Sequence, residues 1–368
     1  MFRIAMFKPY VSRRATELVT EVLKSGWVGE GPRVQEFEAR IGGMVGSQFP
    51  VAVNSGTTAL HLALLTAGIK PRDEVITTAQ TMLATTQAIL AVGAAPVYAD
   101  VQYETGNLAP RDIAGRVTSR TKAILAVDWG GYPCDYDEIL GIARDHGIVL
   151  IEDAAHALGA TYHGKPVGSV CPYTCFSFQA IKHLTTGDGG LVCVPGQREY
   201  NTAIRLRWFG IDRFKRQPSI LGEPVWDVTE LGYKFHMNDV AAAIGLGNLA
   251  DWEFILSRRH HIAARYRNDL CGIPGVQLFA RQDDRSSADW LFSAHVERRE
   301  DFCRAMTSRG IQVSVVHLRI DRNTICGGER GDLPNLSRFT ETHVSLPLHP
   351  LLTDDDVTQV IDAVGAGW

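Results

Sequence analysis

Lys182 is the residue whose surroundings most favour chemistry. It follows Phe176, Phe178 and Ile181 and precedes the small-residue turn TTGDGG. A lysine held in a partly apolar pocket has a lowered pKa, and its neutral amine can form a Schiff base with a carbonyl compound. The alternative is a solvated surface lysine, which is the common state of this residue type. The segment alone leaves both interpretations open.

Asp153 ends the apolar run IVLIED, which predicts a strand. In an open α/β sheet, ligands bind at the carboxyl ends of the strands. A carboxylate there can be catalytic, can ligate a metal or can cap a helix. Pyridoxal phosphate is one ligand that needs such an anion, opposite its protonated ring nitrogen. His156, one helical turn further on, can contact the ring hydroxyl or can be a buried helix histidine.

The segment NSGTTALHL predicts a helix that begins at Gly56, Thr57 and Thr58. The free N–H groups and the dipole of a helix N-terminus favour a phosphate, although a hydroxyl N-cap without any ligand is an equal alternative. The pattern GxGxxG is absent, so a dinucleotide is not implied. A phosphate cradle, an aspartate and a lysine in this order are the layout of fold-type I pyridoxal-phosphate enzymes.

Apolar strands that alternate with helices must position these residues. Strands are predicted at 73–79, 95–101, 123–128 and 148–155, and helices at 13–25 and 33–46. Uninterrupted apolar strands indicate a mostly parallel sheet with helices on both faces. We expect an α/β fold with a large domain over residues 1–250 and a smaller α+β domain over 251–368. One long helix over 239–270 is predicted to join them.

Composition limits the classes of protein that remain. Of 368 residues, 45% are hydrophobic and 21% are charged, which is typical of a globular protein, and a net charge of −4 gives no reason to expect a nucleic-acid partner. The seven cysteines are odd in number and include no CxxC pair, so neither a disulfide framework nor a metal site is expected. No apolar run reaches about 18 residues. We expect a soluble, cytoplasmic protein with no membrane span.

Ordered motifs along nearly the whole chain resemble the nucleotide-sugar aminotransferases of the DegT/DnrJ/EryC1/StrS family. The resemblance is carried by SGWVGEGPRVQEFE, SGTTALHLAL, EDAAHALGA, FSFQAIKHLTTGDGG, LGYKFHMNDVAAAIGL and VSLPLHPLLTDDDVTQVIDAV. It implies a fold-type I transferase whose large domain holds a mostly parallel mixed sheet flanked by helices, with pyridoxal 5'-phosphate as its cofactor.

The resemblance also implies a role for individual residues. Lys182 would be the Schiff-base lysine and the proton carrier, and Asp153 would pair with the pyridinium nitrogen. His156 would contact the ring hydroxyl, and Met82 would lie against the ring through its polarizable thioether. The phosphate would be bound by Thr57, Thr58 and Ser177.

Family members are homodimers with shared active sites, and the segment LGYKFHMND supplies the contact with the partner. Lys234 stands there in place of the common asparagine, and an ammonium can reach a phosphate as a point charge. His236 stands where an arginine is usual.

Two further segments depart from the family pattern. The run DWGG at 128–131 replaces His-Leu-Tyr-Gly, so Asp128 and Trp129 are expected to alter the sugar pocket or the acceptor geometry. In VVHLRIDR, His317 and Arg319 are expected either to contact the sugar and its phosphates or to form a surface strand and turn.

The expected activity is an aminotransferase in amino-sugar or polysaccharide biosynthesis. L-glutamate would donate the amino group and a keto-sugar would accept it, with a nucleotide-linked 3- or 4-keto (deoxy)sugar favoured. A non-nucleotide keto-sugar or a cyclitol is the main alternative acceptor. A pyridoxamine-phosphate sugar dehydratase is disfavoured, because that branch has a histidine in place of the lysine. A cofactor-free regulatory protein is disfavoured because both Lys182 and Asp153 are present.

Overall fold

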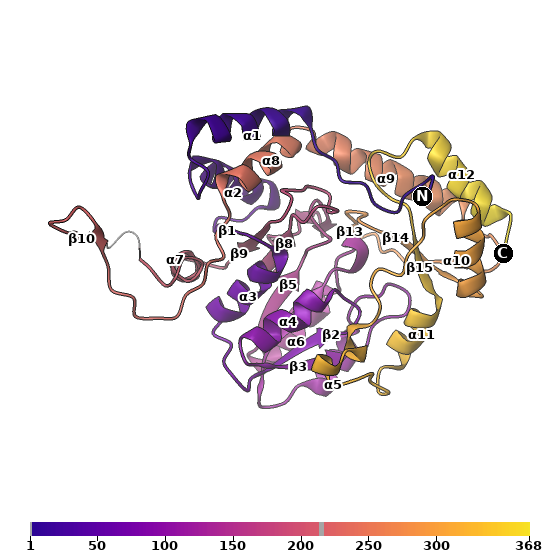
Figure 1. The fold of residues 1–368 in the computed structure, drawn as a ribbon. Coiled ribbons are helices and arrows are strands. Elements are labelled where there is room, and N and C mark those ends of the chain that lie inside the picture. Colours follow the sequence, from indigo (N-terminus) through magenta and orange to yellow (C-terminus); the bar gives the residue numbers. More distant parts are fainter. Residues whose placement is uncertain (1, 213–216) are drawn as a thin grey trace.

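A seven-stranded sheet forms the centre of the computed structural model, which describes residues 2–212 and 217–368 (Figure 1). Its strand order is β1-β9-β8-β5-β4-β2-β3. The strands are β1 (Pro50–Val53), β2 (Glu74–Thr78), β3 (Ala95–Ala99), β4 (Thr121–Val127), β5 (Val149–Asp153), β8 (Tyr173–Ser177) and β9 (Gly190–Cys193).

The register of this sheet aligns the carboxyl ends of its central strands. β3, β2, β4, β5 and β8 pair in parallel, and β9 is antiparallel to both β8 and β1. Val127 lies opposite Asp153, and Asp153 lies opposite Cys175. The mostly parallel mixed sheet confirms the expected fold class, and it places the end of β5 at the middle of one sheet edge.

Helices cover both faces of the sheet because its strands are apolar on both sides. On one face, Leu125 and Ile151 pack in a core with α3 (Gly56–Thr66), α4 (Leu83–Ala91) and α7 (Gln197–Leu206). On the other, Ala126 and Leu150 pack with α5 (Pro110–Arg116) and α6 (Tyr136–His146). That face is completed by α1 (Arg13–Ser25), α2 (Pro32–Val45) and α8 (Asp239–Leu249).

The C-terminal part of the chain builds a second, smaller sheet in the order β12-β14-β15. Its strands are β12 (Val276–Leu278), β14 (Phe292–Val296) and β15 (His343–Leu346), and they pack against α9 (Trp252–Asp269), α10 (Arg299–Ser308) and α12 (Asp354–Gly365). Ile4, from the other end of the chain, is buried in the same core. The domain boundary that we expect at residue 250 falls between α8 and α9, and it stays a prediction.

Shorter elements complete the fold. A small sheet joins β13 (Arg285–Ser286), β6 (Thr161–Tyr162) and β7 (Lys165–Pro166), and α11 (Pro334–Thr342) follows two 3₁₀ turns at Ile320–Arg322 and Thr324–Cys326. A third 3₁₀ turn spans Trp129–Gly131. The hairpin of β10 (Gln217–Pro218) and β11 (Pro224–Val225) projects from the body as an arm (Figure 1).

The prediction of one long helix over 239–270 was wrong. The structure breaks it after Leu249, and α8 and α9 meet at an angle of 63°. The break has a packing cause, because α8 lies so close to α1 that a Cβ on Gly247 would be 2.2 Å from the Cα of Ala15, whereas α9 must turn away to reach the second core. Among the described residues no single helix is long and apolar enough to cross a membrane, although this bent pair passes on length and composition together.

Candidate active site

A cavity of about 300 Å³ opens at the carboxyl ends of β4, β5 and β8, beside the N-terminus of α3. The structure brings six of the residues predicted from the sequence to its wall, together with His317. They are Thr57, Met82, Asp153, His156, Ser177 and Lys182. These six residues and His317 come from five separate segments, so the cavity is a product of the tertiary fold.

Lys182 lies in the turn after β8 and faces this cavity. Its Nζ is 3.8 Å from the centre of the Trp290 ring. Burial lowers the pKa of Lys182 to about 7; the negative charge of Asp153 opposes this shift and the positive charge of Arg259 adds to it. A large fraction of the amine is therefore neutral near pH 7, as nucleophilic attack on a carbonyl group requires.

Asp153 is the last residue of β5 and is buried. Its Oδ2 accepts a hydrogen bond of 2.9 Å from the hydroxyl of Thr85, and its Oδ1 accepts one of 3.2 Å from the backbone N–H of Ala155. Burial raises the pKa of Asp153, whereas both hydrogen bonds and the charge of Lys182 lower it. The site thus compensates in part for burying a carboxylate, which suits a cationic partner in the cavity.

His156 and His317 each present an unpartnered nitrogen at the wall of the cavity. Nδ1 of His156 and Nε2 of His317 are buried and have no hydrogen-bond partner among the described residues. Burial and the charge of Lys182 lower the pKa of both rings, that of His317 to about 4, so both are neutral at pH 7. A buried polar atom without a partner is costly, so these nitrogens fit a polar ligand.

The N-terminus of α3 forms the other end of the cavity. Ser55 caps the helix by accepting a hydrogen bond from the N–H of Thr58, and the Thr58 hydroxyl in turn accepts one from the N–H of Ser55. Gly56 allows the close approach of β8, since a Cβ there would be 2.8 Å from the Cβ of Ser177. Gly56, Thr57 and Ser177 line the cavity, so N–H and hydroxyl donors converge there, as an anion requires.

Thr58 does not line the cavity, contrary to expectation. Its hydroxyl also hydrogen-bonds the side chain of Asn54 and the carbonyl of Ser55, within the helix cap. Thr58 therefore holds the start of α3 in shape. Met82, by contrast, precedes α4 at the mouth of the cavity and leaves 52% of its surface exposed.

The structure corrects the role expected for Arg319. We expected it to contact a sugar or its phosphates, but its guanidinium is fully buried and forms bonds of 2.7 and 2.6 Å with the two carboxylate oxygens of Asp321. Its remaining donors reach Glu329, the hydroxyl of Ser337 and the carbonyl of Arg330. No donor is left for a substrate, and the arginine holds a loop together instead.

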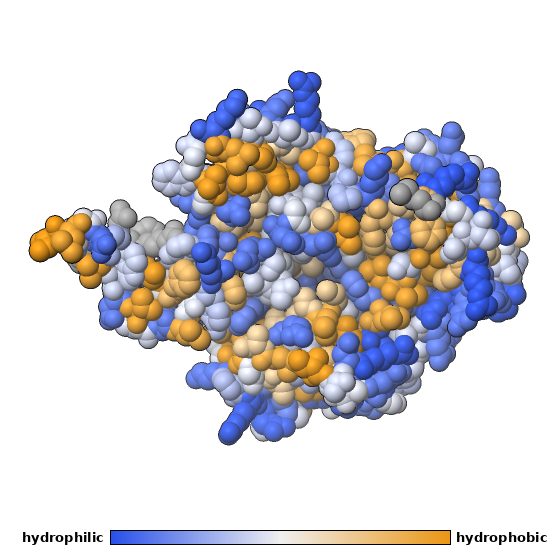
Figure 2. All heavy atoms as spheres, in the orientation of Figure 1, coloured by the Kyte–Doolittle hydropathy of each residue, from blue (hydrophilic) through white to orange (hydrophobic). Residues whose placement is uncertain are grey.

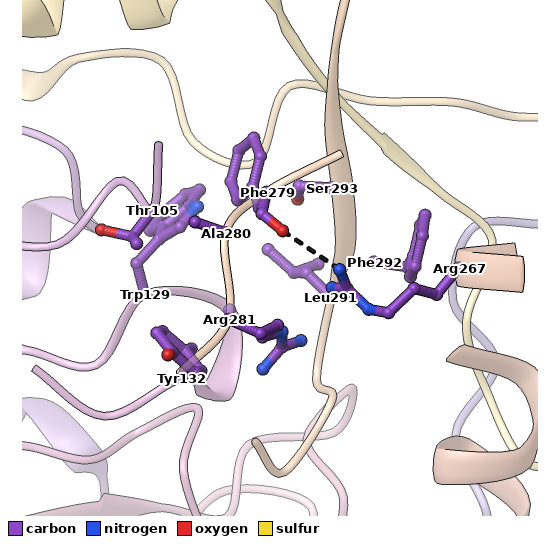
Figure 3. Close-up of a pocket in the computed structure, with 11 residues that line it drawn as sticks. Thr105, Trp129, Tyr132, Arg267, Phe279, Ala280, Arg281, Leu291, Phe292 and Ser293 are labelled. Carbon is purple, nitrogen blue, oxygen red and sulfur yellow. Dashed lines mark hydrogen bonds between the residues drawn. The ribbon is translucent and has the colours of Figure 1, made fainter. Parts of the chain in front are cut away.

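Trp129 is buried and contributes to a second hollow whose lining shares no residue with the cavity at Lys182. Figure 3 shows this hollow, with the guanidinium groups of Arg267 and Arg281 pointing into it and Arg267 donating a hydrogen bond of 3.1 Å to the carbonyl of Phe279. The ring of Trp129 meets those of His156 and His317 edge-on at 5.9 and 6.3 Å. Trp129 thus lies behind the two histidines, and a direct sugar contact is not supported.

Lys234 is exposed and does not line the cavity of its own chain. Its carbonyl accepts a hydrogen bond of 3.2 Å from the side chain of Asn54, and its Nζ lies 5.8 Å from the centre of the Trp208 ring. Its expected contact therefore depends on a partner chain, and the role stays a prediction.

Sequence reasoning missed Thr85 and Trp290. Thr85 lies 68 positions before Asp153, and Trp290 lies 108 positions after Lys182. Gln179 and Asp188 line the cavity as well, and their nearness to Lys182 in the sequence could have identified them. For Thr85 and Trp290 no local pattern existed.

The fold, with an amine, a carboxylate and a helix N-terminus in one cavity at the sheet edge, is that of the fold-type I pyridoxal-phosphate-dependent transferases. The model of the DegT/DnrJ/EryC1/StrS aminotransferase family matches residues 9–365, and the chain belongs to this family. It is therefore an enzyme, an aminotransferase that uses pyridoxal 5'-phosphate.

Three similar proteins illustrate the relationship. The spore coat polysaccharide biosynthesis protein SpsC of Bacillus subtilis is 38% identical over 97% of this chain and 95% of its own length. The crystal structure of the sugar aminotransferase CalS13 from Micromonospora echinospora is 38% identical, covers 99% of this chain and 100% of that one, and has a TM-score of 0.94. Spr1654 of Streptococcus pneumoniae, named as a sugar aminotransferase and solved in its PLP-form, is 29% identical over 98% and 97% of the two chains, with a TM-score of 0.90.

The residues of this cavity fit pyridoxal phosphate. The unpartnered Nδ1 of His156 can bond a ring hydroxyl, the carboxylate of Asp153 can face a ring nitrogen, and the donors around Thr57 and Ser177 can bind a phosphate. Lys182 borders the same space with its amine. The polar groups thus match the cofactor in number and in chemical type.

Proposed function

We propose that this pyridoxal-phosphate-dependent sugar aminotransferase moves an amino group from L-glutamate to a nucleotide-linked 3- or 4-keto (deoxy)sugar, with Lys182 as the lysine to which the cofactor attaches. The observation that carries the proposal is the position of the Lys182 amine in one cavity with Asp153 and His156. The sugar as acceptor is supported by CalS13 and Spr1654, both named as sugar aminotransferases. The nucleotide is supported by the resemblance to nucleotide-sugar aminotransferases.

The residues divide the work by their chemistry. When bound, pyridoxal phosphate supplies an electron-withdrawing ring that stabilises negative charge beside the amino group. Asp153 keeps a negative charge where the ring nitrogen would lie, and Thr85 fixes the direction of its carboxylate. Thr57, Ser177 and the N–H groups of α3 bind the phosphate and so set the position of the ring.

Lys182 carries the proton that the transfer of an amino group requires. With a pKa lowered to about 7, its Nζ can both accept and return a proton near neutral pH. His156 is neutral, and its unpartnered Nδ1 would hold a hydrogen bond to the ring hydroxyl of the bound cofactor.

A homodimer with shared sites belongs to the same proposal. Lys234 is exposed and away from its own cavity, so it is free to reach a partner chain. An apolar groove lies beside α1 and α8, lined by Val11, Ala15, Val19 and Ile244 among others, with Trp27 and Val28 exposed nearby. Figure 2 shows apolar side chains gathered over these helices and at the tip of the arm, where Ile220 and Leu221 are exposed.

Borohydride reduction and isotope transfer test the proposal. Peptide mapping after reduction of the holoenzyme should place the pyridoxyl group on Lys182, and the pyridoxyl group on another lysine would contradict the assignment. With ¹⁵N-glutamate and a series of keto-sugar nucleotides, mass spectrometry should find ¹⁵N in one amino sugar. Transfer to a free keto-sugar or cyclitol instead would favour the alternative acceptor, and loss of a hydroxyl without ¹⁵N would indicate a dehydratase. Lys182→Ala should form none of these products.

A further inference from the structure

Trp290 contacts two of the candidate catalytic groups at once. It is 1% exposed, its ring lies 3.8 Å from Nζ of Lys182, and it stacks on the ring of His156 at a centroid distance of 3.8 Å and an angle of 16°. Its indole N–H donates a hydrogen bond of 3.0 Å to the carbonyl of Ile181, the neighbour of the lysine. The tryptophan is therefore tied to the lysine turn by both its face and its edge.

The backbone of the DWGG segment packs directly against the segment that carries Trp290. The carbonyls of Gly130 and Gly131 accept hydrogen bonds of 3.1 and 2.8 Å from the N–H groups of Leu291 and Ala288. Gly131 has a φ of 97°, and a Cβ on it would be 2.6 Å from the carbonyl oxygen of His156 and 3.1 Å from the nitrogen of Trp290. A side chain at position 131 would push the tryptophan segment away, so Gly131, which this run shares with the family pattern, and the tryptophan form one structural unit.

The ring of Trp290 is a close contact of the Lys182 amine. Within the described part of the chain, no hydrogen bond or ion pair joins Nζ of Lys182 to a side chain. The charged and titratable groups around it are Asp153 at the end of β5, Arg259 on α9, and the neutral rings of His156, His183 and His317. Asp153 is the single anion in this set. The negative face of an indole ring attracts an ammonium, and the Trp290 ring that faces Lys182 is itself buried.

We propose that Trp290 is a positioning residue for the amine of Lys182. Its π face holds the ammonium beside the cofactor site whenever the lysine is free, and its stack on His156 keeps the imidazole edge turned to the same site. The protonated amine is thus kept at the position from which it would deliver its proton in the next transfer. The proposal rests on the proposed attachment at Lys182, and mapping after borohydride reduction tests that part separately.

A shape-conserving substitution gives the sharpest test. Fluorinated tryptophans of increasing fluorine content, inserted at position 290 alone, keep the size of the ring and progressively weaken its negative face. The readout is the pH dependence of the rate at which the apoenzyme takes up pyridoxal phosphate, because only the neutral amine reacts. We expect the midpoint of this profile to fall stepwise, by about 0.5–1.5 pH units in total. A ring with a weaker negative face stabilises the ammonium less, so the amine loses its proton at a lower pH.

Two controls separate this effect from general packing. The same analogues at Trp368, whose ring packs on Phe302 at 4.9 Å, should leave the midpoint unchanged. Trp290→Phe, which keeps a π face without the indole N–H, should retain a midpoint closer to that of the native protein than Trp290→Met does. A midpoint that ignores fluorination at 290, or one that moves equally with the analogues at 368, would overturn the proposal.

Discussion

Thr85 donates a hydrogen bond of 2.9 Å to Oδ2 of Asp153, across the gap between the first turn of α4 and the end of β5. The bond joins two helix- and strand-end residues that are 68 positions apart. This hydrogen bond lowers the pKa of the buried carboxyl group and fixes the orientation of the carboxylate. A threonine without any catalytic signature is thereby part of the site.

Substitutions at these two residues should therefore affect catalysis in a graded way. Asp153→Asn should lower kcat by on the order of a hundredfold or more, because the charge opposite the ring nitrogen is lost. Thr85→Val should cost about tenfold to a hundredfold, the contribution of one hydrogen bond to a charged group. Steady-state kinetics with a saturating donor measure both effects.

Thr86→Val is the matched control for Thr85. Thr86 is also buried, but its hydroxyl bonds that of Tyr98 at 3.0 Å, away from Asp153. Its kcat should stay within about twofold of the native value. Equal losses in both threonine variants would mean that Thr85 acts through packing alone.

Asp128 and Glu152 should share one proton at neutral pH. Both are fully buried, each leaves one carboxyl oxygen without a donor, and burial raises the pKa of both. The charge of Glu152 raises the pKa of Asp128 further. The native state then keeps a proton that the unfolded chain releases above about pH 4, so stability is greatest at low pH and falls as pH rises towards the raised pKa.

Chemical denaturation between about pH 5 and 9 measures this linkage. A retained proton contributes a slope of up to about −1.4 kcal/mol per pH unit to the free energy of unfolding. Asp128→Asn removes the shared proton, so its profile should be flatter by that amount. The exposed Asp145→Asn should keep the native profile. An Asp128→Asn profile parallel to the native one would show that no proton is shared.

Removal of Arg319 should affect folding and should not selectively affect the sugar. Arg319→Met leaves the buried carboxylate of Asp321 unpaired, which costs about 3–5 kcal/mol. The double variant Arg319→Met/Asp321→Leu should recover part of this loss. Arg322→Met, which breaks an exposed pair with Glu329, should cost less than about 1 kcal/mol. Unfolding in urea measures the stability of all three variants. If Arg319→Met kept the native stability but had a higher KM for the acceptor, the result would favour a direct contact between Arg319 and the substrate.

Mixed dimers test the role of Lys234. If it completes the partner's site, Lys182→Ala chains mixed with inactive Lys234→Ala chains should regain part of the activity, since one site of each mixed dimer is intact. Lys182→Ala mixed with Asp153→Asn should regain no activity, because both residues belong to the cavity of their own chain, so each site of that mixed dimer carries one lesion. A monomer in light scattering would rule out shared sites.

Local sequence determined the fold class and the chemistry at the centre of the site. Apolar strands alternating with helices need only short-range patterning, and they define a mostly parallel sheet with Asp153 at a strand end. The helix that begins at Gly56 and the turn that holds Lys182 are local as well. Such features follow from periodicity and from residue type, so they are readable one segment at a time.

Tertiary structure alone decided which residues surround that centre. Trp290 reaches Lys182, and Thr85 reaches Asp153, through packing between segments that are distant in sequence. The burial of Arg319 against Asp321 and the break between α8 and α9 have the same origin. A side chain's local sequence fixes its chemistry, but its exposure and its partners depend on which surfaces the rest of the chain covers, and no periodicity records that.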